Sequence, residues 1–420
     1  MNIATNASHF GDFSRRHKIC FVNANYHLGG AETVMHQLIE ASKRCGLEFQ
    51  VILPTAGKQH PKANIKLLYP RVFDRLRYTR FKPFIERLVP PVSYQSKSFF
   101  RIAQRNADLV HVHSYTGYAD IKSLAAIAKL KPVLWTLHCY WGLGSEFEGS
   151  KRYPAAFGLA PQLLRNPKCA TELQGLNDEL APLYKSPLWI STPSASAAEA
   201  ARRCPELKAW KIHHIPNGIS IPESVRNGES EVVGRVGYDR PTILIVNRDF
   251  KIEDKGFPII TEALVALPQK TVAKIVLVGH HATWAAQQLP SKFAAVGYEF
   301  VASRKKMFEL YAQADIFLFA SRRENFPCVT LEAMATGLCV VATPTDGVKE
   351  QIVSGEHGLL SEQIDGTQLG RKLADVMADQ ALRTRLGQNA RKRVLDEFSE
   401  EQMVAKFLDV YEQMIRSPQS

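Results

Sequence analysis

Residues 316–344 read IFLFASRRENFPCVTLEAMATGLCVVATP. Two short apolar runs, at 316–321 and 339–344, enclose a helical segment, and Gly337 lies where a glycine would cap that helix. Both runs are continuously apolar rather than alternating, which is typical of parallel strands with helices on both faces of the sheet. The stretch therefore predicts one strand–helix–strand unit of an α/β fold.

Seven more runs of this kind occur along the 420 residues. They are KICFVNA (18–24), FQVILPT (49–55), LVHVHS (109–114), VLWTLH (133–138), LWISTPS (188–194), TILIVNR (242–248) and KIVLVGH (274–280). Longer helical patterns separate these runs. The repetition predicts a doubly wound α/β architecture throughout the chain.

One segment interrupts the series. Residues 222–241, PESVRNGESEVVGRVGYDRP, are rich in Pro, Gly, Asn and Ser, as linkers and loops are. We predict a loose N-terminus over 1–17, an N-terminal domain over 18–232, a C-terminal domain over 233–399 and a final amphipathic helix within 400–420. Two domains agree with a length of 420 residues.

Composition restricts the compartment and the partners. Lys and Arg number 53 against 41 Asp and Glu, so the formal net charge is +12, which favours anionic partners. Seven scattered cysteines without a C-x-x-C pair fit reduced thiols in a cytoplasm and argue against a zinc ribbon. Because no apolar run resembles a signal peptide or a membrane span, we expect a cytoplasmic protein.

Two carboxylates give the strongest chemical signal. Glu324 and Glu332 stand eight residues apart, and Pro327 between them suits the first turn of a helix. This places Glu324 on a loop and Glu332 early in the helix. Carboxylate oxygens accept hydrogen bonds in pairs, which suits sugar hydroxyls and a ribose diol. Two unrelated surface glutamates are the alternative interpretation.

Two cations follow the run at 242–248. Arg248 and Lys255 lie beyond the carboxyl end of a predicted strand, where open α/β sheets bind ligands. Such a pair can neutralise a phosphate. Acidic neighbours within 249–254 make a solvated basic loop an equally consistent interpretation.

The N-terminal half offers a glycine pair and a histidine. Gly29 and Gly30 precede a helix whose first N–H groups could face a phosphate, although a tight turn explains them as well. His138 closes the run at 133–138. A single histidine at a strand end is more often structural than catalytic, so both interpretations stay open.

The most basic segment spans 71–105. It holds nine Lys or Arg residues but two acidic residues, Asp74 and Glu86, with aromatic and aliphatic residues between them. This composition is typical of a surface that lies on an anionic bilayer, and also of a solvated helix whose Arg stems cover a core. We expect no nucleic-acid partner, since no RNA-binding or helix-turn-helix pattern occurs. Without D-x-D or H-E-x-x-H motifs, we expect no metal and no cofactor.

In this order the motifs resemble those of retaining GT-B glycosyltransferases, a large family that includes mannosyl-, glucosyl- and fucosyltransferases of bacterial polysaccharides. The matching segments are GGAE (29–32), the strand end at His138, STPS (191–194), IPNGI (215–219), R-x6-KG (248–256) and E-x7-E (324–332). The resemblance spans about residues 18–415 and is strongest from 242 to 360. WTLHCYWGLGSEFEG (135–149) is similar to the colanic-acid-type exopolysaccharide subgroup.

The resemblance implies an architecture and a reaction. Two Rossmann-like domains would face a cleft, with the nucleotide sugar on the C-terminal domain and a glycan or polyprenyl-diphosphate-linked acceptor on the N-terminal domain. GDP-mannose or GDP-fucose is slightly favoured over a UDP-sugar as donor. The final helix would return to the N-terminal domain. The enzyme would act in cell-envelope polysaccharide synthesis, peripherally on the inner face of the plasma membrane.

The resemblance also implies roles for single residues. Arg248 and Lys255 would neutralise the leaving diphosphate near the glycine pair. Glu324 and His138 would contact the donor sugar, and Glu332 would bind the ribose. The backbone that assists Glu324 would comprise Asn325, Phe326, Pro327 and Cys328.

One position departs from the pattern. The related subgroup often has His-Asp where this chain has His138-Cys139. A thiol cannot orient an imidazole as a carboxylate does. The alternative hypothesis is therefore a GT-B-fold protein that binds nucleotide sugars as a scaffold, without turnover.

Overall fold

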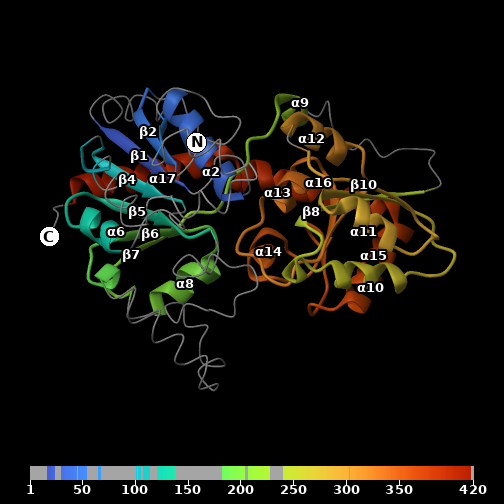
Figure 1. Cartoon of the computed structure of the whole chain (residues 1–420). Coiled ribbons are helices and arrows are strands. Elements are labelled where there is room, and N and C mark those ends of the chain that lie inside the picture. Colours follow the sequence, from blue (N-terminus) through green and yellow to red (C-terminus); the bar gives the residue numbers. More distant parts are fainter. Residues whose placement is uncertain are drawn as a thin grey trace, which may run out of the picture. The chain divides into compact units, whose positions relative to one another are not determined.

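A computed structural model of the chain describes residues 17–23, 30–44, 46–53, 65–67, 101, 103–105, 107–113, 121–138, 182–203, 207–227, 240–301 and 303–417 (Figure 1). The chain divides into two compact units. The N-terminal unit comprises Met1–Pro216 together with Met403–Ser420, and the C-terminal unit is Asn217–Gln402. The division precedes the predicted boundary at 232/233. The reason is that Asn217 donates to the Phe326 carbonyl and Ile219 pairs with Ser399, both within the C-terminal unit.

The N-terminal unit contains a sheet of parallel strands in the order β3-β2-β1-β4-β5-β6-β7. Its strands are β1 (Lys18–Val22), β2 (Glu48–Leu53), β3 (Ile65–Leu67), β4 (Leu109–Val112), β5 (Val133–Thr136), β6 (Trp189–Thr192) and β7 (Lys211–His214). Its helices are α2 (Gly30–Arg44), α6 (Ile121–Ala128), α8 (Ala195–Arg203) and, from Met403 onward, α17 (Glu400–Arg416).

Strand β1 supplies apolar side chains to both faces of this sheet. Ile19 and Phe21 belong to a core built with α2 and α17, whereas Cys20 and Val22 belong to a second core with α6 and α8. Phe407 and Tyr411 of α17 are each 1% exposed. The final helix is therefore part of the N-terminal core and not a surface appendage.

The C-terminal unit contains a second parallel sheet, in the order β10-β9-β8-β11-β12-β13. Its strands are β8 (Thr242–Asp249), β9 (Lys274–His280), β10 (Ala294–Tyr298), β11 (Ile316–Phe319), β12 (Cys339–Ala342) and β13 (Leu359–Leu360). Its helices are α9 (Glu223–Arg226), α10 (Phe257–Val265), α11 (Ala282–Gln288), α12 (Arg304–Ala312), α13 (Cys328–Ala335), α14 (Asp346–Gln351), α15 (Gly366–Ala378) and α16 (Gln380–Glu397), with a 3₁₀ turn at Glu253–Lys255.

Helices cover both faces of this sheet as well. One core joins the sheet to α10, α11 and α15, and the other joins it to α12, α13 and α16 (Figure 1). All nine predicted apolar runs form strands, and the predicted doubly wound α/β class is confirmed for both units.

Both sheets change winding direction once, and this change indicates where to look for a ligand site. In the N-terminal sheet the change lies between β1 and β4, and in the C-terminal sheet it lies between β8 and β11. In open α/β sheets the crevice beyond the carboxyl ends of the strands at such a switch point is the binding site. The loops after these four strands are therefore the places to search for function.

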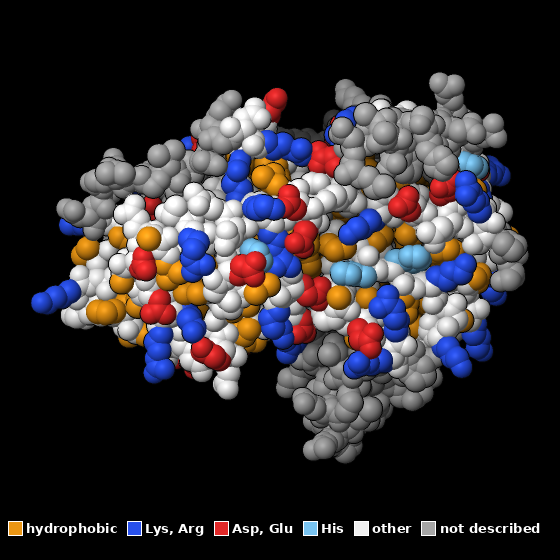
Figure 2. All heavy atoms as spheres, turned by 180° about the vertical axis from the view of Figure 1, so that it is seen from behind, with side chains coloured by type: hydrophobic (Ala, Val, Ile, Leu, Met, Phe, Trp, Pro, Cys, Tyr) orange, Lys and Arg blue, Asp and Glu red, His pale blue; other side chains and the backbone are white. Residues whose placement is uncertain are grey.

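The surface has mixed charge on the face that Figure 2 shows, where Lys and Arg side chains alternate with Asp and Glu. The basic segment 71–105 lies outside the described residues, apart from 101 and 103–105. Within the described part of the chain, no helix combines the length and the apolar character that a membrane crossing requires.

Candidate functional site

The switch point of the C-terminal sheet brings one predicted cation, Lys255, against one predicted carboxylate, Glu324. Arg248 is exposed at the end of β8, and Lys255 ends the 3₁₀ turn that follows. Glu324 lies on the loop after β11, the neighbouring strand. Lys255 and Glu324, 69 positions apart, thus reach one edge of the sheet through the pairing of β8 with β11.

Lys255 and Glu324 form an ion pair. Lys255 Nζ lies 2.9 Å from Glu324 Oε1, and the two side chains are 24% and 16% exposed. From sequence, these groups were assigned separately to a diphosphate and to a sugar. The structure adds that each is the other's counterion, so a bound anion would have to share Lys255 with Glu324.

The backbone beside this pair is fixed by close contacts. The Ser321 hydroxyl and the Arg322 N–H both donate to the Asp254 carbonyl, at 3.0 and 2.8 Å. The Gly347 N–H donates to the Glu324 carbonyl at 3.4 Å. Loop 321–324 is therefore tied to the turn that carries Lys255 and to the start of α14.

Asn217 and Gln351 hold the next part of the loop. Asn217 Nδ2 donates to the Phe326 carbonyl at 3.0 Å, and Gln351 Nε2 donates to the Pro327 carbonyl at 2.9 Å. The Phe326 ring is 4% exposed and packs edge-on against Phe398, with centroids 5.5 Å apart. The Phe326 backbone therefore lies in the loop and accepts a hydrogen bond there, while the Phe326 ring packs in the core.

Helix α13 begins one residue later than the sequence indicated. Pro327 was expected in the first turn, but it is the N-cap residue, with φ −69° and ψ 127°, and Cys328 is the first helical residue. The extended conformation is what the fixed φ of proline allows before a helix. Gly337 follows the helix with φ +79°, and its N–H donates to the Met334 carbonyl at 2.9 Å.

Glu332, the second predicted carboxylate, is held by a tyrosine and an arginine. Tyr311 donates its hydroxyl to Glu332 Oε2 at 3.1 Å, and Arg304 Nη1 lies 3.8 Å from Oε1. Burial raises the pKa of Glu332, against the opposing effect of the Arg304 charge. Burial also raises the pKa of the Cys328 thiol to about 12, with help from the charges of Glu332 and Glu324.

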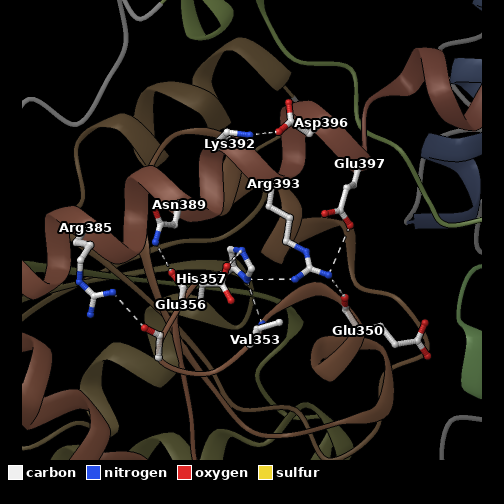
Figure 3. Close-up of polar contacts among 11 residues, drawn as sticks. Glu350, Val353, Glu356, His357, Arg385, Asn389, Lys392, Arg393, Asp396 and Glu397 are labelled. Carbon is white, nitrogen blue, oxygen red and sulfur yellow. Dashed lines mark hydrogen bonds and ion pairs between the residues drawn. The ribbon is translucent and has the colours of Figure 1, made fainter. Parts of the chain in front are cut away.

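Helix α16 fixes the far end of α14, whose first turn contacts Glu324. Arg393 Nη2 donates to the Glu350 carbonyl at 3.1 Å, and Arg393 Nη1 lies 3.1 Å from His357 Nδ1; Figure 3 shows both contacts. Asn389 donates to the Glu356 carbonyl at 3.0 Å. Burial, then the Arg393 charge, lowers the pKa of His357. The turn after α14 is therefore held at several points.

Gly256, next to Lys255, lies very close to the backbone of a neighbouring strand end. Its φ is +71°, and a Cβ atom there would lie 1.4 Å from the Ala320 carbonyl oxygen. We expect Gly256→Ala to destabilise the protein by about 3 kcal/mol or more, since both strain and a backbone clash result. Urea unfolding measures the effect.

The control for this substitution is Gly355→Ala. Gly355 has φ +86°, but a methyl group added there would have no atom within 4 Å. Its cost is expected to be about 1 kcal/mol, from backbone conformation alone. Equal costs at the two positions would show that the contact with Ala320 is readily relieved.

The N-terminal unit places histidines at its own switch point. His111 lies in β4, His113 follows β4, and His138 follows β5. His113 Nδ1 lies 2.9 Å from His138 Nε2. Gly30 begins α2 and is exposed, while Gly29 lies outside the described residues.

A second set of hydrogen bonds supports the first of these histidines. His111 Nδ1 lies 2.6 Å from the Tyr411 hydroxyl, and His111 Nε2 lies 2.6 Å from Thr136 Oγ1. Thr136 Oγ1 in turn lies 2.6 Å from Ser191 Oγ. Helix α17 thus contributes Tyr411 to a polar network inside the N-terminal core.

All three imidazoles are neutral near pH 7. Burial lowers the pKa of His138 to about 3 and lowers the pKa values of His111 and His113 well below the usual range. The neighbouring histidines lower the pKa of His113 further. His138 is therefore suited to hydrogen bonding as a neutral ring, and not to acting as an imidazolium.

Several residues of these sites were not identified from sequence. They are Asn217, Arg304, Tyr311, Gln351, His111, His113 and the pair formed by His281 Nδ1 and Asp249 Oδ1, 2.8 Å apart. His281 also has a φ of +61°, which is unusual for a residue other than glycine. The LVHVHS run did contain both His111 and His113, and their alternation was the available signal.

Within the described residues, no three His, Cys, Asp or Glu side chains gather as metal ligands.

These two sheets define a two-domain α/β protein with Rossmann-like topology in each unit. Two family models match it, one on each half. Residues 28–222 match Glycosyltransferase Family 4, and residues 231–393 match Glycosyl transferases group 1. The chain belongs to the glycosyltransferases of GT-B fold.

Individual relatives differ in how much they share. The WcaC glycosyl transferase of Escherichia coli (strain K12), named for colanic acid biosynthesis, is 21% identical to this chain. The aligned region covers 93% of this chain and 91% of the WcaC chain. The N-acetyl-alpha-D-glucosaminyl L-malate synthase of Bacillus anthracis is 32% identical, over 28% of this chain and 31% of its own. For several curated relatives, the region that aligns with this chain therefore spans less than a third of the relative's length.

A solved structure confirms the fold. Anabaena HepE, in complex with UDP and glucose, superposes with a TM-score of 0.63 at 17% identity, covering 95% of this chain and all of that one. At this identity the likeness establishes the GT-B fold alone.

Proposed function

We propose that this protein is a glycosyltransferase that moves a sugar from a nucleotide-sugar donor to a glycan or lipid-linked glycan in cell-envelope polysaccharide synthesis. The observation that carries the proposal is the Lys255–Glu324 pair at the switch point of the C-terminal sheet, with Arg248 near the end of β8. Cations suit a diphosphate, and a carboxylate suits sugar hydroxyls. The name of the WcaC relative supports the cell-envelope assignment.

The residues of the C-terminal unit divide the donor between them. Arg248 and Lys255 stabilise the charge that develops on the leaving diphosphate. Glu324, relieved of part of its pairing with Lys255, accepts hydrogen bonds from the donor sugar. Glu332, held by Tyr311, accepts from the ribose hydroxyls. His138 of the N-terminal unit contacts the transferred sugar as a neutral ring.

Transfer proceeds with retention of configuration in this proposal. The acceptor hydroxyl attacks on the face that the diphosphate leaves, and a phosphate oxygen receives its proton. No protein carboxylate forms a covalent intermediate, and no metal takes part. Catalysis then depends on positioning and on charge stabilisation by Arg248 and Lys255.

The donor base is tested by thermal shift without added metal, using GDP, UDP, ADP and their common sugar conjugates. A ligand that binds only the native state raises the melting temperature, by RT ln(1 + [L]/Kd) in free energy. We expect a shift with one base, GDP before UDP. The absence of a shift with every nucleotide would contradict the proposal. Binding without transfer or donor hydrolysis would favour the scaffold alternative.

We further propose that segment 71–105 attaches the enzyme to an anionic membrane surface. Its support is the excess of Lys and Arg among apolar residues. Neutralising Arg75, Arg77 and Arg80 is expected to weaken binding to liposomes that contain acidic lipid, because each basic residue near such a surface contributes about 1 kcal/mol. Cosedimentation measures this. Unchanged binding would identify the segment as an ordinary solvated surface.

A further inference from the structure

We propose that His113 is a positioning residue for His138, and that it holds His138 in the tautomer whose proton lies on Nδ1. The proposal rests on the proposed function for its catalytic meaning, since His138 is assigned there to the transferred sugar. The geometry of the two rings carries it independently of activity. The sequence places His113 in the LVHVHS run but does not pair it with His138.

The first step is that the two rings meet through specific atoms. Strands β4 and β5 are parallel neighbours with Val112 opposite Trp135, so the residues just beyond both strands reach the same edge. His113 Nδ1 and His138 Nε2 lie 2.9 Å apart, and the ring planes differ by 18°. This is a hydrogen bond between two imidazoles rather than a casual contact.

The second step is that His113 is itself enclosed by packed neighbours. It is 4% exposed, and its ring lies 4.1 Å from the His111 ring and 6.2 Å from the Phe21 ring, measured between centroids. The backbone N–H of His113 donates to the Val22 carbonyl oxygen at 2.8 Å. A ring enclosed in this way cannot follow a rotation of His138, so it dictates where His138 Nε2 must point.

The third step assigns the shared proton. Both rings are neutral, so one nitrogen of the pair donates and the other accepts. His113 Nε2 is buried without a hydrogen-bond partner among the described residues. A proton on that atom would leave a buried N–H without an acceptor, which proteins avoid more strictly than an unused acceptor. The proton of His113 therefore lies on Nδ1, and His138 Nε2 accepts it.

The consequence is a defined role for His138. With Nε2 occupied as an acceptor, the neutral ring carries its own proton on Nδ1 and presents an N–H donor. Such a donor can bond a sugar hydroxyl oxygen but cannot remove a proton from it. The related subgroup often has an aspartate where this chain has Cys139, and a thiol cannot orient the His138 ring as a carboxylate does. In this chain His113 orients the His138 ring instead. Fixing a tautomer through the other ring nitrogen is a general function of a histidine's partner.

The experiment combines ¹⁵N-histidine NMR with transfer kinetics on the full chain. Long-range ¹H–¹⁵N correlations distinguish the two tautomers, and a His138→Gln sample assigns the His138 signals. We expect wild-type His138 to carry its proton on Nδ1. His113→Leu is expected to turn it into a mixture of tautomers. In the same variant, kcat is expected to fall about 10- to 100-fold with little change in donor KM.

Two further variants separate positioning from packing. His113→Asn places an amide N–H close to the position of Nδ1, so it is expected to restore the tautomer and most of kcat. His111→Gln is the matched control, because His111 is equally buried and contacts His113, while its own hydrogen bonds go to Tyr411 and Thr136. It is expected to leave the His138 tautomer unchanged.

The outcomes keep this inference and the proposed function distinct. A wild-type His138 protonated on Nε2, or a tautomer unaffected by His113→Leu, would overturn the positioning role whatever the activity. A fixed Nδ1 tautomer in a protein that transfers no sugar would instead uphold the geometry and contradict the proposed function.

Discussion

Replacing Lys255 with alanine is expected to weaken nucleoside diphosphate binding about 100-fold, and removing Glu324 as well is expected to restore part of that affinity. The reason is the ion pair with 2.9 Å between Nζ and Oε1. The single substitution removes a cation and also leaves an uncompensated carboxylate beside the diphosphate. Breaking such a pair on one side costs more than the pair itself contributes.

The converse substitution separates binding from transfer. Glu324→Ala is expected to reduce transfer by about 100- to 1000-fold, as the loss of a group that stabilises the transition state does. Nucleoside diphosphate binding should persist or strengthen, because Lys255 no longer shares its charge with a carboxylate. Isothermal titration calorimetry and transfer assays on both single variants and the double variant complete the cycle.

The control is Lys392→Ala. Lys392 also pairs with a carboxylate, Asp396, but it lies exposed on α16. It is expected to change neither binding nor transfer. Loss of nucleotide binding in Glu324→Ala would show that Glu324 has been assigned to the wrong part of the donor. A double variant that binds no better than Lys255→Ala would show that the two charges do not interact.

Acid is expected to destabilise the protein steeply below about pH 6.5, the ordinary pKa of histidine. His111, His113 and His138 have lowered pKa values in the folded state, so the unfolded chain binds more protons than the folded one in this range. Stability therefore rises with pH here and falls as the pH drops. Each ring that stays neutral in the folded protein costs up to about 1.4 kcal/mol of stability per pH unit.

Three such rings would together cost about 3 kcal/mol between about pH 6.5 and 5.5, a large part of the stability of an ordinary domain. Urea unfolding at a series of pH values measures the slope. The double variant His111→Gln, His113→Asn removes two of the three titrating rings and should flatten it. An equal slope in that variant would place the acid sensitivity elsewhere.

Apolar runs predicted most of the fold because they report burial on both faces of a sheet. The strands that they missed are the exposed or short ones. Strand β7 reads KIHH with both end residues exposed, and β10 has exposed ends at Ala294 and Tyr298. Because these strands are partly exposed, their sequences lack the continuous apolar run that marks a strand buried on both faces. The boundary at Asn217 was missed because it depends on long-range bonds, from Asn217 to Phe326 and from Ile219 to Ser399.

The candidate site was predictable as a set of residues but not as a set of pairs. The motifs identified Arg248, Lys255, Glu324 and Glu332 by type and spacing. That Lys255 faces Glu324 follows from the adjacency of β8 and β11, and that His113 faces His138 follows from the register of β4 and β5. Neither adjacency is contained in local sequence, since strand order is decided by the packing of the whole unit.

The course of α17 has a consequence for synthesis. The C-terminal unit is one continuous segment, whereas the N-terminal unit needs Phe407 and Tyr411 to close the core around β1 and β4. Domains ordinarily fold in the order in which the ribosome releases them. Here all residues of the C-terminal unit are synthesised before the N-terminal unit has its final helix. Until α17 is synthesised, the apolar face of the N-terminal sheet that α17 covers stays exposed.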